Sequence, residues 1–276
     1  MLDYIDDLPD IQHIVTEDDT PVDNLPSEKQ QRLLTEPLYS AWAGPGDGRP
    51  FLAAANVGIF SMLRTPPVVP DMFLSLDVEV AEDWWRKAHR SYFLWEFGKP
   101  PDLVLEIVSN QEGGEDGEKK RKYARMRIDY YVIHDPLRQV MPEVLTAYRL
   151  EGAAYQRQET ARFPLLGLGL ALWEGVFEGK RDTWLRWTDA EGAIIPTGKE
   201  LAEQERRRAG EERLRAEAER QRADADCQRA EAECQRAERA ERQLAEQRGQ
   251  VEQLMALLRR AGIDPDSRGS APPPSV

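Results

Sequence analysis

Two acidic residues, Asp102 and Glu106, stand inside an apolar segment of strand-forming residues, 101–109. An unpaired carboxylate is costly to bury in such a run unless a metal ion or a charged partner compensates it. Side chains two and four residues apart in a strand point to the same side, so we expect Asp102 and Glu106 on one face. Packing alone does not explain this pattern, which indicates a functional site.

Two residues elsewhere in the chain could join this site. Asp71 follows Pro70 in a preceding strand-like segment and reaches the same place if the two strands are neighbours. Converging carboxylates would form an all-oxygen site for Mg²⁺ or Mn²⁺. Lys119 lies one helical turn before Tyr123 and could present an ammonium group that orients a nucleophile or neutralises developing charge. Pro-Asp pairs and lysines at helix starts are common, so the spacing alone does not decide.

The composition argues against zinc chemistry and against a disulfide framework. The only cysteines, Cys227 and Cys234, both lie in a polar helical tail. The histidines are scattered through the chain at His13, His89 and His134. No apolar run is long enough to cross a bilayer, and the acidic residues 1–7 do not resemble a signal peptide. We therefore expect a cytoplasmic protein without a membrane partner.

The formal net charge of −13 argues against nucleic-acid binding through the field of the whole molecule. Any such contact must be local. The candidate patch follows the acidic strand directly and comprises Lys119, Lys120, Arg121, Lys122, Arg125 and Arg127. Taken alone, these residues are most simply a solvated helix face. Their position beside the carboxylates keeps a functional role open.

Hydrophobic periodicity predicts an α/β fold with a central mixed sheet flanked by helices. A helix is expected to begin at Ser27, with Ser27 as its cap and Gln30 in the capping-box position. A second helix is expected at about 118–127. The expected strands lie at 51–63, 68–80, 101–109, 130–133, 144–150 and 155–158, and two aromatic segments, 163–173 and 177–187, should extend or cover the sheet.

The composition changes after Pro196 to Ala, Glu, Arg and Gln with a seven-residue rhythm. One heptad position stays small or apolar at Ala216, Ala223, Ala230, Ala237, Leu244, Val251 and Leu258. This predicts a long helix that could form a homo-oligomer as a coiled coil, driven mainly from Leu244 to Leu258. The expected domains are an acidic flexible lead-in (1–25), a core domain (26–196), the long helix (197–262) and a disordered tail (263–276).

The motifs in this order resemble one nuclease family. They are Val69-Pro70-Asp71, the segment 101–109, Glu115-x3-Lys119-x3-Tyr123 and 129–133. The set is similar to the Uma-two family of restriction endonucleases, within the PD-(D/E)xK nuclease superfamily. The likeness continues through 184–187 and into the heptad tail, a layout typical of cyanobacterial-type members. It covers nearly the whole chain.

The resemblance implies a restriction-endonuclease-like core and divalent-metal-dependent hydrolysis of phosphodiester bonds, with DNA as substrate. Carried over by position, Asp71 and Glu106 would be metal carboxylates and Lys119 the catalytic lysine, with Mg²⁺ or Mn²⁺ as cofactor. Glu115 would be a further ligand. Asp102 is either another ligand or a residue that caps the start of its strand, and the sequence leaves both readings open.

Two residues depart from the family pattern. The usual superfamily lysine, two residues after the acid, is replaced here by Val108, so Lys119 would have to reach the site from a helix. Glu115 stands where the family more often has Asp, and its longer side chain could alter the placement of a metal. The intact set of acids favours catalysis. The acidic net charge and the substituted lysine position favour the alternative function: a catalytically inactive nuclease fold that serves as a binding and oligomerisation module.

Overall fold

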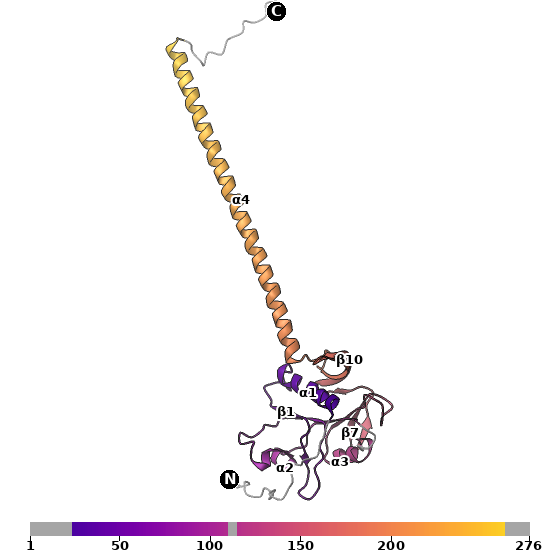
Figure 1. Cartoon of the computed structure of the whole chain (residues 1–276). Coiled ribbons are helices and arrows are strands. Elements are labelled where there is room, and N and C mark those ends of the chain that lie inside the picture. The colour runs from indigo at the N-terminus through magenta and orange to yellow at the C-terminus, as the bar shows by residue number, and fades with distance from the viewer. Residues whose placement is uncertain (1–23, 110–114, 263–276) are drawn as a thin grey trace, which may run out of the picture. The chain divides into compact units, whose positions relative to one another are not determined.

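The computed structural model describes residues 24–109 and 115–262 (Figure 1). The chain divides into two compact units, residues 1–204 and 205–276. The expected acidic lead-in up to residue 23, the segment 110–114 and the expected tail from residue 263 lie outside the described residues.

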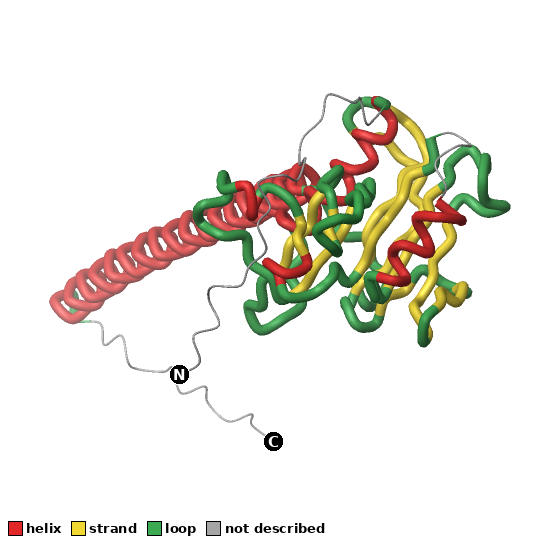
Figure 2. Tube along the Cα trace, turned by 90° about the horizontal axis from the view of Figure 1, so that it is seen from below, coloured by secondary structure: helices red, strands yellow, loops and turns green. Residues whose placement is uncertain are grey.

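A six-stranded mixed sheet forms the centre of the first unit, so the predicted α/β architecture is confirmed (Figures 1 and 2). The strand order is β1-β3-β5-β6-β7-β8. Strands β5 and β6 pair in parallel, and every other neighbouring pair in this sheet is antiparallel. The strands are β1 (Phe51–Ala54), β3 (Met72–Leu76), β5 (Leu103–Ile107), β6 (Tyr130–His134), β7 (Leu145–Glu151) and β8 (Ala154–Arg157).

One face of this sheet packs against helix α1 (Leu25–Ser40) and a second, three-stranded antiparallel sheet. Alternate residues of β5, Leu103, Leu105 and Ile107, point into this core, where Leu34 of α1 is also buried. The second sheet has the order β11-β10-β9 and consists of β9 (Arg162–Phe163), β10 (Leu168–Phe177) and β11 (Lys180–Thr188). The aromatic segments therefore do cover the core, as predicted.

The opposite face of the large sheet packs against α3 (Lys120–Arg125). Val104 of β5 belongs to this second core, together with Phe73 and Tyr131 of neighbouring strands and Tyr123 of α3. Helix α3 follows a π-helical turn, η2 (Glu115–Lys119). The face also carries a parallel strand pair, and the remaining short elements are β2 (Ile59–Phe60), β4 (Tyr92–Phe93), η1 (Lys87–His89) and α2 (Leu94–Phe97).

Three sequence predictions need correction. The cap of α1 is Asn24 and not Ser27, because the Asn24 side chain accepts a hydrogen bond from the Ser27 backbone N–H at 3.0 Å. The strand expected at 51–63 is interrupted between β1 and β2, where Asn56 adopts a positive φ of 55°. The strand expected at 68–80 is shorter, since it begins after Pro70 and ends before Asp77, whose φ is 59°.

The long C-terminal helix is present as α4 (Gly198–Arg260). None of its residues is buried. No helix in the described parts of the chain combines the length and apolar character needed to cross a bilayer.

Candidate active site

The antiparallel register of β3 and β5 brings two of the predicted acids together. Met72 pairs with Leu105, so Asp71, one residue earlier, stands across from Glu106, one residue later. The Asp71 carboxylate extends this pairing, because its Oδ2 accepts a hydrogen bond from the Ile107 N–H at 2.6 Å. Glu106 alternates with Leu105 and Ile107 and therefore points to the face that α3 covers.

Glu106 is fully buried, and α3 with the turn before it supplies its polar partners. The Lys119 Nζ donates to Glu106 Oε2 at 2.8 Å, and the Tyr123 hydroxyl donates to Oε1 at 2.5 Å. Lys119 and Tyr123 are one helical turn apart, so both can face the same carboxylate. The predicted lysine is therefore in contact with the acid of β5, although it comes from a helical segment instead of the strand.

The charges in this cluster are strongly coupled. Burial raises the pKa of the Glu106 carboxyl to about 8; the Lys119 ammonium opposes this shift and the nearby Asp71 carboxylate adds to it. Burial disfavours the charged form of Lys119, but the carboxylates of Glu106, Asp71 and Glu115 outweigh it and raise the pKa of Lys119 above its usual value. Lys119 is therefore an ammonium at neutral pH.

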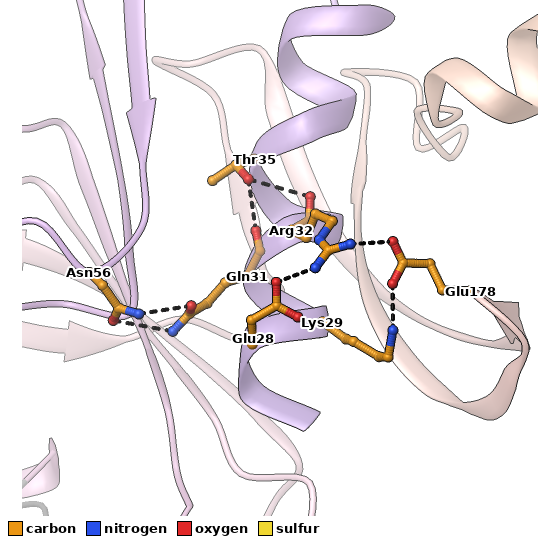
Figure 3. A network of polar contacts seen from close by, with 7 residues as sticks. All are labelled: Glu28, Lys29, Gln31, Arg32, Thr35, Asn56 and Glu178. Atoms are coloured by element: carbon orange, nitrogen blue, oxygen red, sulfur yellow. Dashed lines mark hydrogen bonds and ion pairs between the residues drawn. The ribbon is translucent and has the colours of Figure 1, made fainter. Parts of the chain in front are cut away.

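Asp71 is held in place by a side-chain network from α1 and the loop after β1. Gln31 Nε2 donates to Asp71 Oδ1 at 3.1 Å. Gln31 and Asn56 also exchange two hydrogen bonds through their amide groups, as Figure 3 shows. Gln31 is buried, and it holds Asp71 Oδ1 while the Ile107 N–H holds Oδ2. Together these bonds fix the rotamer of the Asp71 side chain.

Glu115 also reaches the cluster. Its Oε1 lies 3.9 Å from the Lys119 Nζ, and its side chain is buried. Its other oxygen, Oε2, is buried without a hydrogen-bond partner among the described residues. An unpaired buried carboxylate oxygen is costly, which marks this position as one where a cation or water would be accommodated.

The donor set fits a hard divalent cation. Within residues 24–109 and 115–262, no three His, Cys, Asp or Glu side chains are already arranged as a metal-binding group. Mg²⁺ does not require one, because it keeps several waters and is commonly held by one or two carboxylates. Asp71 and Glu106, which stand across from each other in the register of β3 and β5, would be such a pair, and Glu115 reaches the same cluster through Lys119.

Comparison with known proteins identifies a family for this chain. The family model of Uma2, described as "Putative restriction endonuclease", matches residues 17–174, which include the whole cluster. The chain belongs to the Uma2 family. We found no match among curated proteins and none among solved structures. Membership in Uma2 indicates a nuclease of the restriction-endonuclease type.

One residue predicted for the site does not join it in this Uma2 protein. Asp102 lies just before β5, about 13 Å along the strand from Glu106 at the usual rise per residue. Its Oδ2 accepts hydrogen bonds from the Leu76 N–H at 2.7 Å and from the Lys99 Nζ at 2.6 Å. The expectation that Asp102 and Glu106 share one site is not met, and the geometry favours the alternative in which Asp102 caps the start of its strand.

Replacing Asp102 with alanine separates these two roles. We expect the free energy of unfolding to fall by about 1–2 kcal/mol, because the Leu76 N–H and the Lys99 ammonium lose their acceptor. Nuclease activity per folded molecule should stay at the wild-type level. Chemical denaturation and a plasmid-cleavage assay measure the two quantities. Lost cleavage with unchanged stability would instead assign Asp102 to the metal site.

Sequence reasoning missed Gln31 as a residue of the Uma2 site. The signal was present, because Gln31 stands on the apolar face of α1 with Leu34 and Leu38 at helical spacing, where all three are buried. A polar side chain in such a stripe needs a buried partner. The neighbouring Gln30 shows the same logic: its amide bonds both backbone groups of Leu185 in β11.

Proposed function

We propose that this Uma2 protein is a divalent-metal-dependent endonuclease that hydrolyses phosphodiester bonds in DNA. One observation carries the proposal: Asp71 and Glu106 face each other across β3 and β5, with the Lys119 ammonium 2.8 Å from Glu106. Two carboxylates can hold a divalent cation, and a lysine ammonium can stabilise the charge that develops on a transferring phosphoryl group.

In this proposal, Asp71 and Glu106 would hold the cation and Glu115 would contribute through its partnerless oxygen. A bound Mg²⁺ or Mn²⁺ supplies the polarisation of a phosphoryl oxygen and the lowered pKa of a water ligand. Lys119 keeps its proton and donates hydrogen bonds, either to the attacking water or to a phosphate oxygen on which charge develops. Tyr123 also keeps its proton, since burial and the adjacent Glu106 raise its pKa, and it orients the Glu106 carboxylate.

Cleavage of supercoiled plasmid by the purified full chain tests the proposal. With Mg²⁺ or Mn²⁺ we expect conversion to nicked or linear DNA, and with EDTA we expect none. The Glu106→Gln variant, purified in the same way, controls for contaminating nucleases. Absence of cleavage with both metals would overturn the proposal.

The long helix supports a second candidate function, assembly through self-association. An exposed helix of 63 residues with a seven-residue apolar rhythm buries none of its side chains within one chain. We infer that the segment from Leu244 to Leu258 pairs with a second copy, where Leu244, Val251 and Leu258 are all exposed in the single chain. If the nuclease site were silent, this assembly would be the remaining function.

Truncation of the helix tests the assembly. Glu200 pairs with the buried Arg186 and receives the Thr197 N–H, so the cut belongs after Gln204, at the end of the first unit, and not after Pro196. Sedimentation should show a dimer or larger species for the full chain and a monomer for residues 1–204. Val251→Glu in the full chain should give the same monomer. A monomeric full chain would contradict the inference.

A further inference from the structure

Helix α3 has a second surface that the proposed chemistry does not use. Its Tyr123 is fully buried against Glu106, whereas Arg121 and Arg125 are exposed. These two arginines are four residues apart, so they lie on the same side of the helix. Six of the nine residues 119–127 are basic, in a chain whose net charge is −13. The helix therefore has one side in contact with the candidate active site and another side that is basic, in a protein that is acidic as a whole.

The basic side chains border a defined hollow. It has a volume of about 280 Å³ and lies between α3 and the start of β8, with Lys120, Arg121 and Arg125 on one side and Ala153, Ala154 and Tyr155 on the other. Two contacts hold these walls together: Arg127 donates to the Gly152 carbonyl, and the Tyr155 hydroxyl donates to the Ile128 carbonyl at 2.8 Å. The small alanine side chains leave the guanidinium groups accessible from this side.

Most other cations of this segment already have partners. Lys120 pairs with Asp116 at 2.9 Å and lies over the Tyr148 ring, and Lys122 pairs with Glu118 at 2.7 Å. Arg121 and Arg125 form no ion pair with any described residue, although Glu118 lies within electrostatic range of Arg121. Two exposed guanidinium groups beside one hollow, without an internal anion, suit an external anion.

We propose that Arg121 and Arg125, with the hollow beside them, bind backbone phosphates of the nucleic acid that the site cleaves. This inference rests on the proposed function and adds to it the surface that holds the substrate. Guanidinium groups match phosphate oxygens in geometry as well as in charge. The hollow and Glu106 lie on different sides of one helix, whose diameter with side chains is about 10–12 Å. Phosphates bound at the hollow would therefore lie about one helix diameter from the candidate site.

The test measures binding without cleavage. Fluorescence anisotropy of a labelled DNA duplex, titrated with the full chain in EDTA, gives the dissociation constant over a salt series of roughly 50–200 mM. The double variant Arg121→Glu/Arg125→Glu should bind at least about tenfold more weakly than wild type. Its salt dependence, the slope of log K against log salt, should be smaller by about 2, one for each lost phosphate contact.

The matched control is Lys180→Glu/Arg181→Glu, which makes the same charge change at two exposed positions of β11. It should bind like wild type, because the proposed phosphate contacts are local to α3. A general electrostatic effect would instead weaken both variants equally. Circular dichroism checks that each variant is folded. If the glutamates destabilise α3, Arg121→Gln/Arg125→Gln should still show a reduced slope.

The outcomes separate this inference from the proposed nuclease function. Equal affinity and slope for wild type and the α3 variants, or equal losses in the α3 and control variants, would overturn the phosphate surface even if the protein cuts DNA. No detectable binding of DNA by the wild-type chain would overturn it as well. Binding that depends on Arg121 and Arg125, in a protein that cleaves nothing with either metal, would support the surface and overturn the nuclease.

Discussion

Replacing Glu106 with glutamine is expected to abolish metal-dependent DNA cleavage, with kcat lowered by roughly 10²- to 10⁴-fold. Glutamine keeps the size of the side chain and one oxygen acceptor but removes the negative charge. Glu106 stands across from Asp71, so the change halves the carboxylate pair that would hold the cation. Initial rates of plasmid nicking, compared at saturating Mg²⁺ or Mn²⁺, measure the loss.

The pH dependence of metal binding gives this variant a second measurement. Since burial raises the pKa of Glu106 to about 8, the metal-free carboxyl is mostly protonated below that pH, and a cation must displace the proton. Wild-type affinity for Mn²⁺ should therefore rise with pH until about 8 and then level off. Calorimetric titration on either side of this pH should show the rise in wild type and no such rise in Glu106→Gln.

A conservative surface variant is the control for Glu106→Gln. Glu174 is exposed in β10, and Glu174→Gln removes the same charge away from the site. It should cut DNA like wild type. Equal rates for wild type, Glu174→Gln and Glu106→Gln, all purified in the same way, would show that the cleavage comes from a contaminant.

Replacing Lys119 with methionine is expected to lower kcat by at least about a hundredfold while leaving metal binding intact. Methionine fills a similar volume and removes the ammonium that lies 2.8 Å from Glu106. Loss of that cation removes a competitor for the carboxylate but also raises the pKa of Glu106 further. Mn²⁺ affinity should therefore be equal to or higher than that of wild type at a pH well above 8, where the carboxyl is ionised in both proteins. A variant that loses the rate of DNA cleavage but keeps its affinity for Mn²⁺ identifies Lys119 as a catalytic residue.

Lys122→Met provides the comparison on the same helix, because Lys122 pairs with the exposed Glu118 and does not contact Glu106. It should retain wild-type cleavage. If Lys119→Met cleaved DNA at the wild-type rate, Lys119 would serve only to neutralise Glu106, and a different group would have to stabilise the developing charge.

The sequence was sufficient to predict the main elements, and it predicted a meeting of Asp71 with the β5 acid on the condition that their strands are neighbours. The apolar run around Glu106 requires a buried strand, and an acid in such a strand requires partners, whatever the rest of the fold. The position of Lys119 one turn before Tyr123 predicted that its ammonium could reach the site, and Lys119 does contact Glu106. These predictions depend on local spacing, which a single sequence contains.

Other features depend on the pairing of distant segments, which spacing does not encode. Asp102 has the right spacing to share a face with Glu106, but it precedes the strand and pairs with Lys99 instead. Gln31 meets Asp71 only because α1 packs beside β3. The pair β2 and β4 is two residues long on each strand, too short for any periodic signal.

The lysine that contacts Glu106 belongs to a short helical segment and not to the sheet. Detachment of residues 115–125 would cost far less free energy than unfolding of the strands, because only Glu115 and Tyr123 of that segment are buried. The molecule could then stay folded while its acid and its amine are separated. On heating, the protein would thus lose its activity at a lower temperature than the Tm at which the whole domain unfolds.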